Sequence, residues 1–261
     1  MKRLWTSSRL AFVAVLTVAA CLMVGCKKDT APSTRDLLLG KWSLMSSGNE
    51  VCATNDRIVV SFADDGSGVC VHPAINLPDG SALGFISKDE SKYSLDGNML
   101  SMTINDWGCF SHITSIDQRT MSLTVDSMGF LGTCLPSSIS CSFARVNNNF
   151  EQAIIGSWNV VGMTDNPLYD AASYRFDFNA DGTYAFFELN DNGEWVAPSD
   201  LSQTYSVNGN WLSTFWVLSD GTPSFECWDI DKIQGDKMYW SAVRKDAQGN
   251  ITMPSMTLQR L

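Results

Sequence analysis

YSLDGNMLS at Tyr93–Ser101 recurs as YSVNGNWLS at Tyr205–Ser213, and this repeated stretch decides the fold. Three other short segments recur in the same order: Leu39–Trp42 with Ile155–Trp158, Val60–Gly66 with Phe176–Gly182, and Ser142–Val146 with Thr257–Leu261. The offsets lie between 112 and 116 residues, so only small insertions and deletions separate the two copies. The chain is therefore predicted to hold two homologous domains in tandem, at residues 37–147 and 148–261.

The N-terminal 25 residues have the pattern of a bacterial secretion signal rather than of a folded element. Basic residues precede an apolar run from Leu10 to Val24, which is too short for a comfortable membrane span. Met23–Cys26 resembles a lipoprotein lipobox, and Val18–Cys21 is a second candidate. Cys26 is preferred because a polar tether, residues 26–36, starts there. The resemblance implies a lipidated Cys26 and a lipid-anchored protein of the bacterial cell envelope, at the outer membrane. A secreted protein with an incidental cysteine is the alternative.

Charge excludes one class of partner. Removal of residues 1–25 takes away three basic and no acidic residues, so the net charge changes from −10 to −13. A polyanion needs a basic surface that releases its counterions, so nucleic acid is not an expected partner. The same argument disfavours electrostatic docking on anionic lipid.

Cysteine usage does not predict a unique disulfide scaffold. Five cysteines lie in the first repeat and one in the second: Cys52, Cys70, Cys109, Cys134, Cys141 and Cys227. A bridge between Cys134 and Cys141 could close the loop between them, and buried apolar thiols are the alternative. A C-x-x-C motif is absent from the sequence, so no redox or zinc site of that kind is expected.

The pattern along each repeat is β throughout, after one opening helical turn. Ser33 with Asp36, and Asn149 with Gln152, have the spacing of a capping box. The segments that follow alternate with period two, as in Tyr174–Phe178, and Asx-Gly turns separate them at short intervals. We expect an all-β fold with eight or nine strands per repeat. An up-and-down sheet of that many strands closes most readily into a barrel, because closure removes its exposed edges.

Each repeat, with these segments in this order, resembles the small lipocalin-like domains of bacterial lipoproteins. The resemblance covers nearly all of residues 37–261. In that family a tryptophan plugs the closed end of the barrel and an arginine of the last strand lies across it. The resemblance therefore implies the structural pairs Trp42 with Arg145 and Trp158 with Arg260. Such a pair is a cation–π contact.

Motifs for metal binding and catalysis are weak. Asp177–Glu188 satisfies the EF-hand pattern, but the flanking residues alternate as strands do, so a bulged hairpin is expected there instead. The two histidines, His72 and His112, have no counterparts in the second repeat, and solvated strand or loop positions explain them. No catalytic residue, metal site or cofactor is predicted, and the chain is not expected to be an enzyme.

An excess of aromatic residues distinguishes the second repeat. Leu212, Thr214 and Trp216 align with the core-facing side of the equivalent strand in the first repeat, so Trp211 and Phe215 lie on the opposite side. This surface could pack against the first repeat, bind a ligand, or be ordinary strand residues. The residues predicted to bind a ligand are Trp211, Phe215, Trp216, Trp228 and Trp240.

These patterns favour a membrane-anchored lipoprotein that binds a small apolar molecule or a glycan without catalysis. The alternative is a structural subunit of a surface protein assembly, whose partner is another envelope protein and which takes no small ligand.

Overall fold

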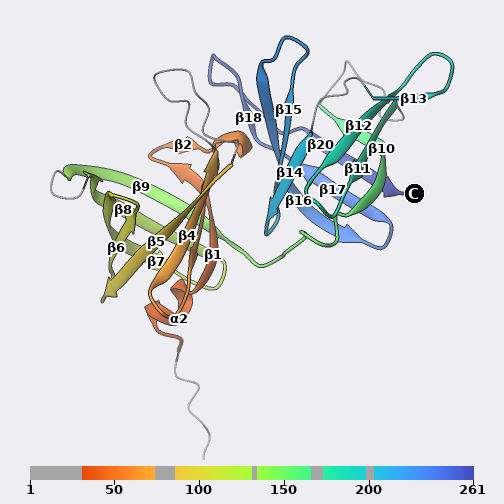
Figure 1. Ribbon diagram of the computed structural model, residues 1–261. Coiled ribbons are helices and arrows are strands. Elements are labelled where there is room, and N and C mark those ends of the chain that lie inside the picture. Colours follow the sequence, from red (N-terminus) through yellow and green to blue (C-terminus); the bar gives the residue numbers. More distant parts are fainter. Residues whose placement is uncertain (1–30, 74–85, 131–133, 166–172, 198–202) are drawn as a thin grey trace, which may run out of the picture. The chain divides into compact units, whose positions relative to one another are not determined.

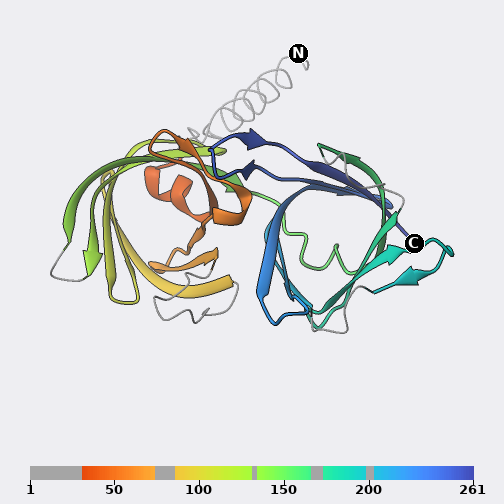
Figure 2. The same cartoon turned by 90° about the horizontal axis from the view of Figure 1, so that it is seen from above.

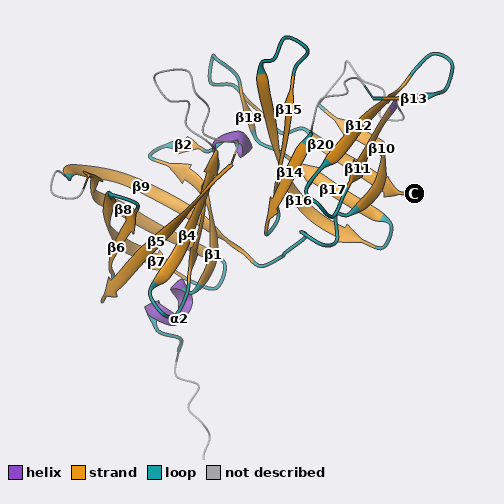
Figure 3. Cartoon of the chain, in the orientation of Figure 1, coloured by secondary structure: helices purple, strands orange, loops and turns teal. Residues whose placement is uncertain are grey.

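The computed structural model describes residues 31–73, 86–130, 134–165, 173–197 and 203–261. The predicted secretion signal and Cys26 lie outside these residues. Thr34–Leu261 forms one compact unit. Strands make up most of this unit, and every strand pairing in it is antiparallel, so the predicted all-β class is confirmed (Figure 3).

A closed eight-stranded antiparallel barrel, here called the first barrel, is formed by the first half of the unit. The sheet order is β2-β1-β3-β4-β5-β6-β7-β8-β9, and β1 also pairs with β9, which closes the ring (Figure 1). The elements are α2 Thr34–Leu38, β1 Gly40–Ser47, β2 Glu50–Val51, η1 Thr54–Asp56, β3 Val59–Phe62, β4 Ser67–Pro73, β5 Ile86–Asp96, β6 Met99–Ile104, β7 Trp107–Ile116, β8 Thr120–Phe130 and β9 Leu135–Val146.

A second nine-stranded sheet, here called the second sheet, has the order β13-β12-β11-β10-β20-β17-β16-β15-β14 and curves round on itself (Figure 2). The start of β12 and the start of β14 meet at a single bridge between Thr183 and Thr204, beside a 3.0 Å hydrogen bond from Tyr184 N to Gln203 O. The strands are β10 Gly156–Thr164, β11 Tyr174–Phe178, β12 Tyr184–Leu189, β13 Trp195–Val196, β14 Thr204–Asn208, β15 Trp211–Val217, β16 Pro223–Gln234, β17 Lys237–Ser241 and β20 Ser255–Arg260; β18 Arg244–Lys245 and β19 Ile251–Thr252 form a separate hairpin.

The opening turns differ between the repeats. α2 is helical, whereas residues 151–154 form only a turn, held by a 3.0 Å hydrogen bond from Ile154 N to Phe150 O. Asn149 Oδ1 accepts from Glu151 N at 3.2 Å, so its side chain caps this turn at Glu151 rather than at Gln152, which the capping-box spacing had indicated.

One end of the first barrel is closed by a tryptophan and an arginine. The Arg145 guanidinium carbon lies 4.2 Å from the centroid of the Trp42 ring. Arg145 donates to the carbonyl oxygens of Leu37 and Leu39, and Trp42 Nε1 donates to Leu38 O at 2.8 Å. These bonds satisfy carbonyl groups that the end of a helix leaves without partners.

The second repeat has the same arrangement. Arg260 lies 4.1 Å from the Trp158 ring and donates to Ile155 O at 2.8 Å and Ala153 O at 2.7 Å. These are the two pairs that the family resemblance implied. The glycine of each Gly-x-Trp motif is explained by the same contact: a Cβ on Gly40 would lie 2.9 Å from Arg145 Nη1, and the backbone there has a φ of 111°.

The segment with the EF-hand pattern is a hairpin, as predicted. β11 leads into it and β12 leaves it, with Tyr174 paired to Glu188. In the turn, Asp181 accepts hydrogen bonds from Thr183 N at 2.9 Å and Thr183 Oγ1 at 2.6 Å. Asp65 and Ser67 make the same two bonds in the first repeat. The shared sequence therefore encodes an Asx turn.

Each repeat has its own apolar core, and the predicted faces of the central strands are confirmed. Leu100 belongs to the core of the first barrel and Leu212 to that of the second sheet. Trp211, on the opposite face of β15, belongs to a third cluster that also includes Val59 and Val71 of the first barrel.

The suggested bridge between Cys134 and Cys141 is wrong. All six cysteines among the described residues are free thiols. Cys134 Sγ lies 3.7 Å from Phe130 O, whereas Cys141 Sγ contacts Ser47 Oγ at 3.9 Å. The two side chains point to different neighbours because Cys141 faces the barrel core, against which it packs.

Candidate functional site

Trp228 and Trp240 lie inside the second sheet. Trp228 is 5% and Trp240 is 1% exposed, and their ring centroids are 5.9 Å apart. The guanidinium of Arg244 lies 4.7 Å from the Trp228 ring and forms a 3.0 Å ion pair with Glu226. These two predicted ligand-binding residues therefore form part of a filled aromatic core, which also contacts Phe176.

Trp211 lies between the two repeats. It is 2% exposed, and its Nε1 donates a 3.0 Å hydrogen bond to Thr54 O of the short helix η1. Thr54 is itself fixed to the second sheet region, because its N donates to Val243 O at 2.8 Å and its Oγ1 accepts from Val243 N at 2.8 Å. Of the three uses that the sequence left open for Trp211, its burial favours packing against the first repeat.

Phe215 and Trp216 are half-buried on β15. Phe215 lies opposite Phe225 of β16, and Trp216 lies opposite Ser224. Their strand is thus covered at its Trp211 end and more open at its Val217 end. The five predicted ligand-binding residues do not form one continuous surface, because they are divided between the interior and the exterior of the second sheet.

A different set of apolar residues, not predicted from the sequence, gathers at one end of the first barrel. Ile104 packs against the barrel core and pairs with Trp107, which in turn pairs with Phe130. Directly opposite residues of antiparallel strands share a face, so Trp107 and Phe130 lie on the inner face of the barrel. The same argument applies to Met128, which lies opposite Cys109, a residue packed against the core. Leu135 lies opposite Met128 and is therefore also on the inner face.

These inner-face residues are nevertheless exposed. Trp107 and Phe130 are each 51% exposed, Met128 is 45% and Leu135 is 72% exposed, and the Trp107 and Phe130 ring centroids are 4.7 Å apart. We call these four residues the open-end cluster. Their end of the barrel is opposite α2, because α2 contacts Asn98 in the turn before β6, whereas Trp107 follows β6. Exposed apolar side chains of this size usually mark an interaction site.

A polar group faces the same end of the barrel. Cys70 belongs to the core and pairs with Asp89, so Asp89 and His72, two residues beyond Cys70, share the inner face. His72 Nε2 lies 2.9 Å from Asp89 Oδ2, and its Nδ1 lies 2.7 Å from Pro73 O. Ser87 Oγ donates to Asp89 Oδ1 at 3.1 Å. The hydrogen bond from His72 is the main cause that lowers the pKa of Asp89.

This group lacks the geometry of a serine nucleophile with its base. The hydroxyl of Ser87 is directed at Asp89 and not at the imidazole of His72, so the histidine is not placed to take the serine proton. His112 is exposed on β7. Among the described residues, no three His, Cys, Asp or Glu side chains gather in a way that could hold a metal ion.

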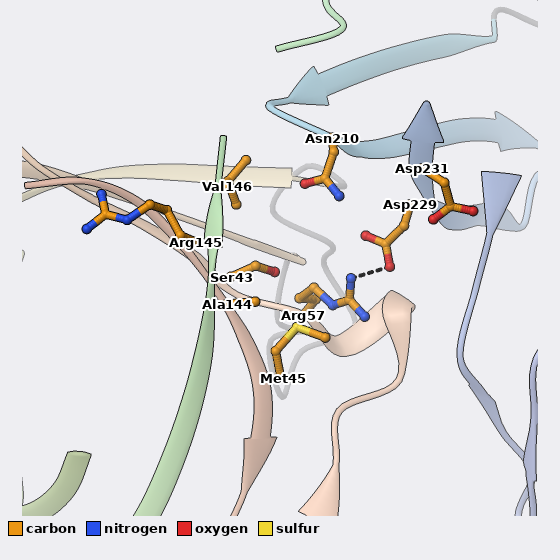
Figure 4. A pocket seen from close by; sticks show the side chains of 9 residues that line it. All are labelled: Ser43, Met45, Arg57, Ala144, Arg145, Val146, Asn210, Asp229 and Asp231. Atoms are coloured by element: carbon orange, nitrogen blue, oxygen red, sulfur yellow. Dashed lines mark hydrogen bonds and ion pairs between the residues drawn. The ribbon is translucent and has the colours of Figure 1, made fainter. Parts of the chain in front are cut away.

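A cleft of about 150 Å³ lies where the two repeats meet (Figure 4). Its lining residues are Ser43, Met45, Arg57, Ala144, Arg145 and Val146 of the first repeat, with Asn210, Asp229 and Asp231 of the second. Arg57 Nη1 forms an ion pair with Asp229 Oδ2, and the Arg57 side chain is only 3% exposed. Burial raises the pKa of Asp229, and the Arg57 guanidinium opposes this effect.

A β-bulge explains why sequence reasoning missed the open-end cluster. The register of β8 shifts between Val125 and Ser127 against both neighbouring strands. An extra residue in a strand moves the side chains that follow to the other face. Simple alternation from the buried Met121 and Leu123 therefore places Phe130 incorrectly, and nothing else in the sequence marks the shift.

No helix in the described part of the chain has both the length and the apolar character that a membrane span needs. In comparisons with known proteins, no family model and no curated protein sequence matches this chain.

Proposed function

We propose that the chain is a lipid-anchored protein of the bacterial envelope whose two lipocalin-like barrels act as a non-enzymatic binding module. In this proposal the open-end cluster of the first barrel takes a small apolar molecule. The observation that carries it is the exposure of Trp107 and Phe130 on an inner barrel face, where apolar side chains are normally covered. Burial of about 100 Å² of ligand surface against them would contribute roughly 2–3 kcal/mol.

The neighbours of the aromatic pair favour an apolar ligand over a sugar. Met128 and Leu135 extend the same face, and Ile139, opposite the buried Val125, is 39% exposed beside them. A sugar ring stacked on Trp107 would need hydrogen-bond partners for its hydroxyl groups. The polar groups of Ser87 and Asp89 on this face are already bonded to each other.

The test uses residues 27–261, which contain the whole compact unit. Binding of 1-anilinonaphthalene-8-sulfonate, decanoic acid and maltotriose is measured for the unaltered protein, for Trp107→Ala combined with Phe130→Ala, and for Phe110→Ala. Phe110 is the matched control because it is 41% exposed on the same strand but on the outer face, next to the inward Cys109. We expect decanoate and the dye to bind, and only the double variant to lose them.

Two results would reject this site. If the double variant binds as well as the unaltered protein, the ligand lies elsewhere. If neither an apolar molecule nor maltotriose binds, the small-ligand function is rejected and the assembly subunit becomes the better proposal.

The lipid anchor is tested separately by growth of the source cells with labelled palmitate. The unaltered protein should carry the label and Cys26→Ala should not. A label that persists in Cys26→Ala and disappears in Cys21→Ala would move the modification to the other candidate lipobox.

A further inference from the structure

We propose that the cleft between the repeats binds a small primary amine that also carries an oxygen acceptor, as in an amino alcohol or an amino acid. This site is distinct from the open-end cluster. It is built from polar groups of both repeats that lack hydrogen-bond partners within the described residues.

Four residues that line the cleft have a buried polar atom without a hydrogen-bond partner within the described residues: Ser43 Oγ, Arg57 Nε, Asp229 Oδ1 and Arg145 Nε, the last in a guanidinium that stacks on Trp42. Ser43 is 5% exposed and the Arg57 side chain 3%, so bulk water does not reach them freely. Buried polar groups in native proteins are nearly always hydrogen-bonded. Ser43 Oγ, Arg57 Nε and Asp229 Oδ1, which come from both repeats, therefore indicate a site that a polar guest completes.

The open acceptor at the cleft is a carboxylate oxygen of Asp229, which favours a cationic donor. Arg57 is paired with Asp229, and Asp231 adds a further carboxylate, whose Oδ1 accepts from Ser241 Oγ at 2.8 Å. Arg145 contributes only its stem, because its guanidinium is directed to Trp42 (Figure 4). Arg244 acts on Asp229 from a greater distance. The lining side chains thus carry two positive and two negative charges, and the acceptor left open on Asp229 is a carboxylate oxygen, which an ammonium group can satisfy by a charged hydrogen bond.

The arrangement of donors and acceptors defines the rest of the guest. An ammonium group can donate both to Asp229 Oδ1 and to Ser43 Oγ. Arg57 Nε is a donor only and needs an oxygen acceptor, and Asn210 lines the opposite side of the cleft (Figure 4). A cleft of about 150 Å³ is below the range of about 300–1,000 Å³ for drug-sized ligands, so the guest is short.

The test is calorimetric titration of residues 27–261 with four probes. Ethanolamine and glycine carry both groups, whereas ethylamine lacks the oxygen and acetate lacks the amine. We expect the first two to bind and the last two to bind more weakly by about tenfold or more, the effect of one lost charged hydrogen bond. Tighter binding of ethanolamine would assign the site to amino alcohols, and tighter binding of glycine to amino acids.

Ser43→Ala is the variant of choice, because its hydroxyl has no partner in the described residues and its loss should leave the fold intact. It should weaken ethanolamine binding by about tenfold and leave the melting temperature without ligand unchanged. Ser101→Ala on β6, which does not line the cleft, is the control. Equal binding by Ser43→Ala and the unaltered protein, or no heat with any probe, overturns the proposal. So does a crystal soaked in ethanolamine that shows only water at the three atoms.

Discussion

Trp211 Nε1 donates a 3.0 Å hydrogen bond to the carbonyl oxygen of Thr54, 157 residues earlier in the chain. This bond lies at the centre of the contact between the repeats, beside the apolar cluster of Val59, Val71 and Cys227. Cys227 N donates in addition to Asn55 Oδ1 at 2.9 Å. The short helix η1 thus attaches the first barrel to β15 and β16 of the second sheet through both apolar and polar contacts.

Substitution of Trp211 by serine should therefore destabilise the whole unit. Truncation of a buried Trp costs about 3–5 kcal/mol, and this one also loses a hydrogen bond between repeats. Urea denaturation followed by circular dichroism measures the change. Trp107→Ser, at a tryptophan that is 51% exposed, is the matched control and should change stability by less than about 1 kcal/mol. Equal losses for the two variants would contradict the packing role of Trp211.

Gly156 is required by the arginine beside it. Its φ is 130°, and a Cβ there would lie 2.7 Å from Arg260 Nη1. Gly156→Ala should push the guanidinium away from Trp158 and lower the free energy of unfolding. Gly193→Ala is the control, because its φ is 76° but no atom lies within 4 Å of the added Cβ. It should show only the backbone cost of about 1–2 kcal/mol. In the same denaturation assay Gly156→Ala should lower the free energy of unfolding by more than Gly193→Ala does. A smaller loss would contradict the close approach of Arg260 to Gly156.

Low pH should lower the stability of the first barrel, because it protonates Asp89. The hydrogen bond from His72 lowers the pKa of Asp89 in the folded state below that of the unfolded chain. Its contribution to stability is therefore complete above the unfolded pKa of about 3.9 and is lost as the pH falls through the lower folded value. Melting temperatures measured from about pH 5 down to about pH 2 should fall more steeply for the unaltered protein than for Asp89→Asn. Parallel curves would show that this pair does not act on stability.

Cys70 and Cys227 should resist modification in the folded protein. Burial raises the pKa of each thiol to about 12, and they are 4% and 0% exposed. A thiolate is the reactive form, so a thiol reagent at about pH 8 should reach neither residue until urea is added. Mass spectrometry of the labelled peptides identifies which cysteines react. Rapid labelling of Cys227 in the native protein would mean that the contact between the repeats opens readily.

The sequence alone determined the class of fold, because its signals are local. Period-two alternation and Asx-Gly turns specify antiparallel hairpins, and the two copies of the Asp-Gly turn at Asp65 and Asp181 fold in the same way. The opposite faces of β15 could also be read from the sequence, since side chains alternate strictly in a regular strand.

Only the tertiary structure decided what those faces contact. Trp211 is covered by residues more than 100 positions away, whose approach depends on how two sheets pack rather than on any local pattern. The inner-face position of Phe130 likewise follows from a bulge in β8, and the exposure of Trp107 and Phe130 follows from their place at the open end of the barrel. A one-residue shift reverses the inside and outside of a strand, and the sequence around Asp126 carries no local signal of that shift.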